Sequence, residues 1–404
     1  MENREYIKTG SQVYWRTLFI IFLGSMAAFG AEYCVQPIIP VIASSFGLNA
    51  VQGSLAVSLG LVGMSAAMLL IAGLAPRFDR KLATAVGLIG AAILTIMIGF
   101  SGSFEAILGM RLIQGLLLAA FPSLIIAYIN EEFEPFNVGT VIGIYISGTT
   151  VGGLFGRLVV SAITDFVSWR MGLMIVIGIL YLAVGIAFFM LLPKPKYQRQ
   201  RQSGGLQLIK TFHTALANKK LLWIYLVAFL IMGSFVAVFN FISYVLLAPP
   251  YSLSQTVVGL LFVVYLFGTF SSTYMGRLSD QHGNGRVLIL GLLIMLTGGL
   301  LTLLQPLVFK FIGLAIFTFG MLGSHSVACG WVGKLNQGDK AQSSSMYMFF
   351  YYAGASSLGT LGGVFLESYG WSGVIGMVAA AVIICLLVVV RLELAVSQHL
   401  LWHH

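Results

Sequence analysis

Leu221 to Leu247 read LLWIYLVAFLIMGSFVAVFNFISYVLL, a stretch without a charged side chain. A helix needs about 20 apolar residues to cross the hydrocarbon core of a bilayer. Stretches of this kind recur along the chain and are separated by short polar or glycine-rich connectors. We count twelve, at residues 15–43, 52–75, 82–102, 105–129, 139–163, 170–192, 221–247, 255–275, 287–305, 311–333, 342–366 and 372–392.

The composition excludes a soluble protein. Hydrophobic residues make up 58% of the 404 residues and charged residues 9%, whereas soluble domains contain about 45–50% apolar and about 25% charged residues. Because unpaired backbone amides are costly in lipid, each span must be a helix or part of a closed barrel. The spans lack the alternating pattern of barrel strands. We therefore predict an all-α polytopic membrane protein, and the first span is too long to be the core of a signal peptide.

The basic residues indicate the orientation of the chain. Of the 22 Lys and Arg residues, two lie well inside spans, 18 lie on the side of the N-terminus, and Arg170 and Lys310 lie on the other side. Loops rich in Lys and Arg stay in the cytoplasm. We therefore predict a multi-pass membrane protein with both termini cytoplasmic. The net charge of +9 reports this orientation, and we expect no nucleic-acid partner.

The chain also repeats itself. Similar residues recur at offsets of 204, 205 and 210 residues, namely Leu74 and Leu278, Gly115 and Gly320, and Gly152 and Gly362. Such offsets indicate a duplicated six-helix unit. We predict two parallel-repeat bundles at residues 1–192 and 221–404, joined by a polar cytoplasmic linker at residues 193–220.

The loop after the eighth span carries a family signature. Gly276, Leu278, Asp280 and Gly283 match G-x-L-a-D-r-x-G-r-k, so the sequence resembles the major facilitator superfamily. The copy after the second span departs from the signature, with Pro76 at the aspartate and Asp79 at the second glycine. The resemblance implies a gating role for Gly276, Asp280 and Gly283.

Four further stretches are similar to bacterial efflux permeases of the acriflavin-sensitivity and arabinose-efflux group, a resemblance that implies a place in the bacterial plasma (inner) membrane. Span four contains RLIQG at residues 111–115, like an R-x-x-q-G element associated with proton coupling. Span five contains GIYISGTTVGG at residues 143–153, like the glycine-rich element of antiporters, with Thr149 where a proline is usual. Spans one and ten contribute YCVQP at residues 33–37 and HSVA at residues 325–328. We expect Gly148, Gly152 and Gly153 to allow the helix movements of gating.

Three charged residues lie well inside the spans: Glu32, Arg111 and Arg157. At 1.5 Å per residue they lie roughly 9 to 13 Å from the outer helix ends, and charges at such depth are usually functional. We hypothesise that Glu32 is the proton-coupling carboxylate and that Arg111 or Arg157 pairs with its ionised form. A static buried ion pair is the alternative interpretation.

Several polar side chains are candidates for contact with substrate: Gln36, Gln114, Asn240, Tyr244, Tyr347 and Tyr351. Packing between helices is the alternative for Gln36 and for the tyrosines. His325, near the middle of span ten, is a further proton-coupling candidate, with an uncharged, hydrogen-bonded histidine as the alternative. We read Glu131, Glu132 and Glu134 as a solvated cytoplasmic loop, with the attraction of cations or the binding of basic loops such as residues 77–81 as the alternative.

Together these features predict a secondary transporter that works by alternating access. We expect a proton-coupled antiporter that exports a small amphipathic or cationic solute, such as a drug-like compound or a sugar. A proton symporter that imports a nutrient is the alternative. We expect no enzymatic activity, no catalytic residue, no metal and no cofactor, since the proton gradient supplies the energy. The expected partners are the small-molecule substrate, protons and the lipid bilayer, with the protein as a monomer.

Overall fold

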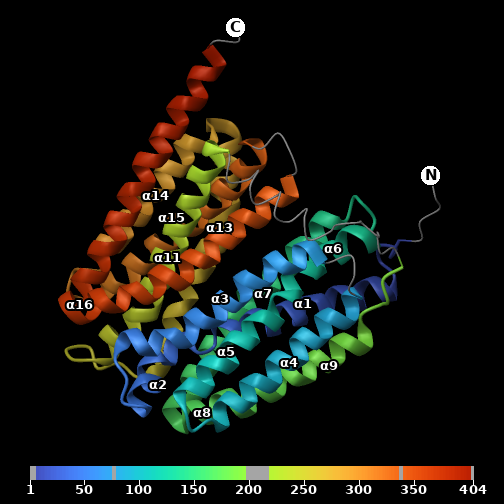
Figure 1. The fold of residues 1–404 in the computed structure, drawn as a ribbon, viewed down its shortest axis with the longest axis horizontal. Helices are drawn as coiled ribbons and strands as arrows, with labels where there is room; N and C mark the ends of the chain where they lie inside the picture. The colour runs from blue at the N-terminus through green and yellow to red at the C-terminus, as the bar shows by residue number, and fades with distance from the viewer. Residues whose placement is uncertain (1–5, 75–78, 197–217, 336–339, 402–404) are drawn as a thin grey trace. The chain divides into compact units, whose positions relative to one another are not determined.

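The computed structural model describes residues 6–74, 79–196, 218–335 and 340–401, and nearly all of them are helical (Figure 1). The first part of the chain forms α1 (Gln12–Tyr33), η1 (Gln36–Ile38), α2 (Ile39–Ser45), α3 (Ala50–Leu74), α4 (Arg80–Phe100), α5 (Phe104–Leu118), α6 (Ala120–Glu132), α7 (Val138–Phe166), α8 (Trp169–Met171), the π-helix η3 (Gly172–Ile179) and α9 (Leu180–Leu191). The second part forms α11 (Lys219–Leu247), α12 (Gln255–Leu260), η4 (Leu261–Val264), α13 (Tyr265–His282), α14 (Asn284–Leu301), α15 (Leu307–Leu335) and α16 (Lys340–Leu401).

The predicted membrane spans are confirmed. Eleven helical stretches among the described residues are long and apolar enough to cross a membrane. The last of them, Ser343–Leu394, contains Gly370 at φ 64°, a left-handed conformation in which one helix ends and the next begins. This stretch therefore holds both the eleventh and the twelfth predicted span.

The described residues group into two compact units. One consists of Met1–Ile38 and Leu59–Leu208, and the other of Ile39–Ser58 and Ile209–His404. The second unit thus takes in α2 and the first part of α3, so the chain passes from one unit to the other within its first span. The division into six-helix halves at residues 193–220 stays a prediction, because residues 197–217 lie outside the described part of the chain.

The same helix pairing occurs in each unit. In the first, α1 packs against α7, and in the second, α11 packs against α16. A Cβ atom on Gly152 of α7 would overlap the Met26 backbone of α1, and one on Gly354 of α16 would overlap the Phe229 backbone of α11. These close backbone approaches connect the first and fifth spans of each half, as expected from a duplicated unit.

The two basic residues on the predicted outer side have structural roles. Arg170 donates from Nη1 to the carbonyl of Gly99, at the end of α4, over 3.1 Å. Lys310 donates from Nζ to the carbonyl of Thr302, directly after α14. Cations are favoured at the C-terminal ends of helices. Both residues bind carbonyl groups at the C-terminal ends of helices, which accounts for two cations on the predicted outer side. Their position therefore does not argue against the predicted orientation.

The segment before α1 is tied to the loop between α6 and α7. The Ile7 amide donates to the carbonyl of Glu132 over 2.8 Å. Glu134 accepts from Thr9 twice, from the hydroxyl over 2.6 Å and from the amide over 3.2 Å. Asn137 in turn donates to the Thr9 hydroxyl. The N-terminal residues therefore strap the ends of α6 and α7 together.

The interpretation of the acidic cluster as a solvated loop is wrong for Glu131 and Glu132, and the alternative, binding of the basic loop at residues 77–81, is confirmed for Glu131. Arg80, at the start of α4, forms a two-pronged ion pair with Glu131, with Nη2 lying 2.8 Å from Oε1. Glu132 is buried and accepts from the Lys196 amide over 2.8 Å. The cluster therefore connects α6 to α4 and to the segment after α9.

We expect the N-terminal strap to loosen in acid. The hydrogen bonds from Thr9 lower the pKa of Glu134 below its ordinary value. A depressed folded-state pKa stabilises the strap above the unfolded-state pKa of about 4.3, and this contribution is lost as the pH falls through the folded-state pKa. Hydrogen exchange of residues 6–11, corrected for its intrinsic pH dependence, should be faster in Glu134→Gln than in the wild type at neutral pH. The difference should vanish in acid. Glu131→Gln is the control, and equal effects of both variants at residues 6–11 would contradict the prediction.

Candidate functional site

The first membrane span is broken near its middle. Pro37 has no amide hydrogen and cannot continue the α-helical ladder. Accordingly α1 ends at Tyr33, the three-residue η1 follows, and α2 completes the span. The last carbonyl groups of a helix lack partners within that helix. The break therefore offers carbonyl oxygens inside a membrane span to donors from other helices.

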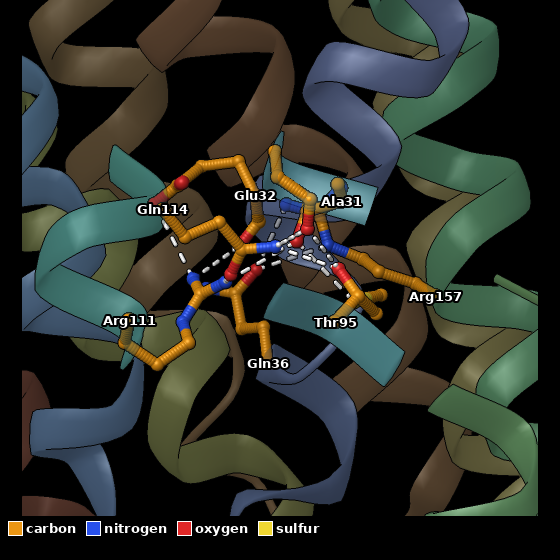
Figure 2. Close-up of polar contacts among 9 residues, drawn as sticks. Ala31, Glu32, Gln36, Thr95, Arg111, Gln114 and Arg157 are labelled. Carbon is orange, nitrogen blue, oxygen red and sulfur yellow. Dashed lines mark hydrogen bonds and ion pairs between the residues drawn. The ribbon is translucent and has the colours of Figure 1, made fainter. Parts of the chain in front are cut away.

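Arg111 of α5 binds this end of α1 (Figure 2). Its Nη1 donates to the carbonyl of Ala31 over 3.2 Å, and its Nη2 donates to the carbonyl of Glu32 over 2.6 Å. A cation is favoured there by the negative end of the helix dipole. Nη1 also donates to the Gln114 side chain, whose amide nitrogen bonds the Thr95 hydroxyl of α4 over 2.7 Å. Arg111 is thus anchored to α1 directly and to α4 through Gln114.

Glu32 lies beside this anchored guanidinium and is fully buried. Its Oε1 is 3.4 Å from Nη2 of Arg111, and its Oε2 is buried with no hydrogen-bond partner among the described residues. Gly60 of α3 leaves room for the pair, since a Cβ there would lie 2.6 Å from Oε1 and 2.7 Å from Nη2. The pair therefore depends on a third helix that contributes no side chain.

Arg157 of α7 approaches the same break from another side, as Figure 2 shows. Its Nε and Nη2 both donate to the Gln36 side-chain oxygen, over 3.0 and 2.8 Å. Its Nη1 donates to the carbonyl of Gly153 over 2.8 Å, and its Cζ lies 4.6 Å from the centre of the Tyr33 ring. The two predicted arginines thus reach opposite sides of residues 31–36, Arg111 at the glutamate and Arg157 at the glutamine.

Three predicted residues of the second half also come together. His325 Nδ1 lies 2.9 Å from the Tyr347 hydroxyl, and the His325 ring centre lies 4.4 Å from that of Tyr351. Asn240 and Tyr244 lie on α11. Asn240 donates to the carbonyl of Gly359 in α16 over 3.3 Å, and the Tyr244 hydroxyl faces Gly53 of α3. The roles assigned to these residues stay predictions.

The predicted gating residues after the eighth span have clear local roles. Gly283 has a φ of 91° and directly follows α13, its amide donating to the carbonyl of Ser279 over 3.0 Å. Asp280 is exposed, and its Oδ1 lies 3.4 Å from Nζ of Lys334 in α15. A Cβ added at Gly276 would make only an ordinary contact with Oγ of Ser326, at 3.5 Å. Glycine is required at 283 because L-residues rarely adopt that conformation.

Two parts of the site are not evident from the sequence. Gly60 lies in a span with many small residues and has no signature of its own. The break at Pro37 has a signal, a proline inside an apolar run, which predicts a kink. Among the described residues no group of three His, Cys, Asp or Glu side chains is placed to hold a metal.

Comparison with known protein families decides the classification. A family model described as Major Facilitator Superfamily matches residues 21–251 and 234–399. The chain belongs to the major facilitator superfamily. It is 38% identical over 383 residues to the uncharacterized MFS-type transporter YybF of Bacillus subtilis (strain 168), covering 94% of each chain. It is 37% identical over 392 residues to the inner membrane transport protein YnfM of Escherichia coli (strain K12), covering 97% of this chain and 94% of that one.

A solved structure supports the fold. The nucleoside transporter NupG superposes with a TM-score of 0.78 at 16% identity, covering 93% of this chain and 99% of that one. The chain is therefore a multi-pass membrane transporter with the alternating-access fold of its superfamily. The departure from the loop signature at Asp79 now has a structural reason. Asp79 caps α4, where its Oδ1 accepts from the Leu82 amide over 3.0 Å.

Proposed function

We propose that this protein is a proton-coupled secondary transporter in which Glu32 carries the proton. The observation that supports this most is the unequal environment of the two Glu32 oxygens. Oε1 lies 3.4 Å from the Arg111 guanidinium, whereas Oε2 is buried with no hydrogen-bond partner among the described residues. A buried polar atom without a partner is costly. Binding a proton removes the charge that makes this burial expensive.

The anchoring of Arg111 makes both protonation states of Glu32 accessible. Ionised Glu32 gains the nearby positive charge, and neutral Glu32 avoids the cost of a buried charge. Losing one partner of a buried ion pair is normally expensive because the other charge is left unpaired. Here Arg111 keeps its bonds to the carbonyls of Ala31 and Glu32 and to Gln114. Protonation of Glu32 therefore leaves Arg111 with these three hydrogen-bond partners.

Infrared spectroscopy of the purified protein tests this proposal without knowledge of the substrate. The carbonyl band of a protonated carboxylic acid should grow as the pH is lowered toward neutral and below. This band should be missing from the difference spectrum of Glu32→Gln. If the wild type and Glu32→Gln give the same difference spectrum, Glu32 does not titrate over this pH range and does not carry the proton.

For the direction of transport we propose antiport, with protons entering as an amphipathic solute leaves. The support is the resemblance of residues 143–153 to the glycine-rich element of antiporters. Gly148 and Gly152 of this element pack directly on the α1 backbone at Phe22 and Met26, on the helix that carries Glu32. This element is therefore placed to transmit movement of α7 to the helix of the proposed proton site.

Symport is the second candidate, because the buried charges are unequal. Arg111 and Arg157 contribute two positive charges within the spans of this half and Glu32 one negative charge, a sum of +1 that becomes +2 on protonation. A negatively charged substrate would bind more tightly to the protonated site, and a cation less tightly. Proton and anion would then travel together.

Everted membrane vesicles with an acidic interior separate the two directions. A transported compound, found by screening dyes, antibiotics and sugars, should dissipate the pH gradient and accumulate inside if the protein is an antiporter. A symporter should instead carry the compound outward together with protons. Loss of either response in Glu32→Gln is expected. An undiminished response in that variant would contradict proton coupling through Glu32.

A further inference from the structure

The guanidinium of Arg157 presents its binding edge to a neutral group. Nη1 is engaged by the carbonyl of Gly153 on the same helix, at 2.8 Å. Nε and Nη2 both donate to the single Gln36 oxygen, over 3.0 and 2.8 Å. These two donors lie on one edge of the guanidinium and point in the same general direction. This pair of donors matches the two oxygens of a carboxylate. In the structure an amide oxygen occupies the position where a carboxylate would bind through both of its oxygens.

The charges around this edge favour an anion. Arg111, Arg157 and Glu32 all meet at residues 31–36 of the broken span, and their charges sum to +1, or to +2 when Glu32 is protonated. Charges removed from water are stabilised by opposite charge. Hydrogen bonds to ionised groups are about twice as strong as neutral ones. A carboxylate should therefore bind this edge of Arg157 more strongly than the Gln36 amide does, because of its opposite charge and because of its stronger hydrogen bonds.

The surroundings indicate what the anion carries. The Tyr33 ring lies with its centre 4.6 Å from Cζ of Arg157 and is half-buried, whereas Gln36 and Arg157 are 1% and 3% exposed. A carboxylate can therefore take this edge of the guanidinium only by displacing the Gln36 side chain, and the Tyr33 ring lies against the same guanidinium. An aromatic ring attached to the carboxylate would contact the part of Tyr33 that the guanidinium does not cover.

We propose that Arg157 and Gln36 form a substrate subsite for an aromatic monocarboxylate. The Nε and Nη2 edge of Arg157 binds the two carboxylate oxygens, Gln36 occupies that edge when no substrate is bound, and Tyr33 packs on the substrate ring. This inference rests on the proposed function only in that the protein transports small solutes. For a carboxylate substrate the second candidate, symport, replaces the antiport proposed above, because a carboxylate bound here and a proton bound at Glu32 stabilise one another.

Direct binding to the full-length purified protein tests the subsite. The probes are benzoate and its neutral analogue benzamide, compared between about pH 6 and pH 8, where the benzoate carboxyl group is ionised. We expect benzoate to bind and benzamide to bind at least about tenfold more weakly, as for loss of hydrogen bonds to a charged group. The Arg157→Gln variant should bind benzoate more weakly than the wild type by a similar factor. The Gln36→Ala variant should bind benzoate as tightly as the wild type or more tightly.

The outcomes separate this inference from the proposed function. Benzoate should bind more tightly at the lower pH in the wild type and with no pH dependence in Glu32→Gln. Binding of benzoate without pH dependence in the wild type would support the subsite and argue against Glu32 as the proton site. Equal binding of both probes, or no binding of benzoate to wild-type protein with a normal melting temperature, would overturn the subsite. An equal loss of benzoate binding in Gln36→Ala and Arg157→Gln would overturn it as well. None of these three results affects the infrared test of Glu32.

Discussion

Glu32→Gln is expected to abolish transport driven by a pH gradient while the protein stays folded. The substitution keeps the size of the side chain and fixes it in a neutral form, so it resembles permanently protonated Glu32. Removing one member of a buried ion pair typically costs about 3–5 kcal/mol. We expect a smaller loss here, because the carbonyls of Ala31 and Glu32 still bind Arg111. Substrate accumulation in proteoliposomes, with and without an imposed pH gradient, measures the effect.

The matched control removes a carboxylate from the helix that carries Arg111. Glu105 is exposed in the first turn of α5 and accepts from the Ser103 hydroxyl over 2.6 Å. Glu105→Gln should leave pH-driven accumulation unchanged. Glu32→Gln should also retain exchange of labelled for unlabelled substrate without a pH gradient, since exchange requires no net proton movement. Normal pH-driven accumulation in Glu32→Gln would refute the coupling role.

Gly60→Ala is expected to have the second largest effect, although it adds a single methyl group. The new Cβ would lie 2.6 Å from Oε1 of Glu32 and 2.7 Å from Nη2 of Arg111, closer than van der Waals contact allows. Arg111 is held from several sides, so Glu32 must move. Overpacking of a buried site costs about 1–3 kcal/mol. We expect pH-driven transport to fall by about 10- to 100-fold, measured in the same proteoliposomes.

An open glycine on the neighbouring helix provides the control for Gly60. Gly109 of α5 lies two residues from Arg111, and a Cβ there meets no atom within 4 Å. Gly109→Ala should leave transport unchanged, and the helix should be slightly stabilised because alanine has the higher helix propensity. If Gly60→Ala transports like Gly109→Ala, the space at Gly60 is not needed for the ion pair.

The sequence predicts the number of spans because the signal is simple. Runs of about 20 apolar residues have few alternatives in a membrane, and all twelve predicted spans are helical. The position of a residue along its helix is also predictable, since each residue adds about 1.5 Å. Glu32 and Arg111 were expected at a similar distance from the outer ends of their helices, and Oε1 of Glu32 lies 3.4 Å from Nη2 of Arg111.

The partner of each arginine could not be predicted in the same way. Depth places a residue along the helix axis but does not give the direction in which its side chain points. The two arginines were equal candidates for Glu32, and the packing of α5 and α7 on α1 decides between their contacts. Arg111 meets Glu32, and Arg157 meets Gln36 one turn further along. Likewise, Gly60 acts through space that it leaves empty, and no residue pattern reports such space.

The break at Pro37 gives the first helix a mechanical property. Pro37 interrupts the hydrogen-bond ladder of this span, so the residues from Cys34 to Ile38 bend more easily than a continuous helix. A bend there moves the carboxyl of Glu32 relative to the amide of Gln36, and with it the carbonyl groups that bind Arg111. A change in the charge of Glu32 and a change in the angle of the first span would therefore be coupled.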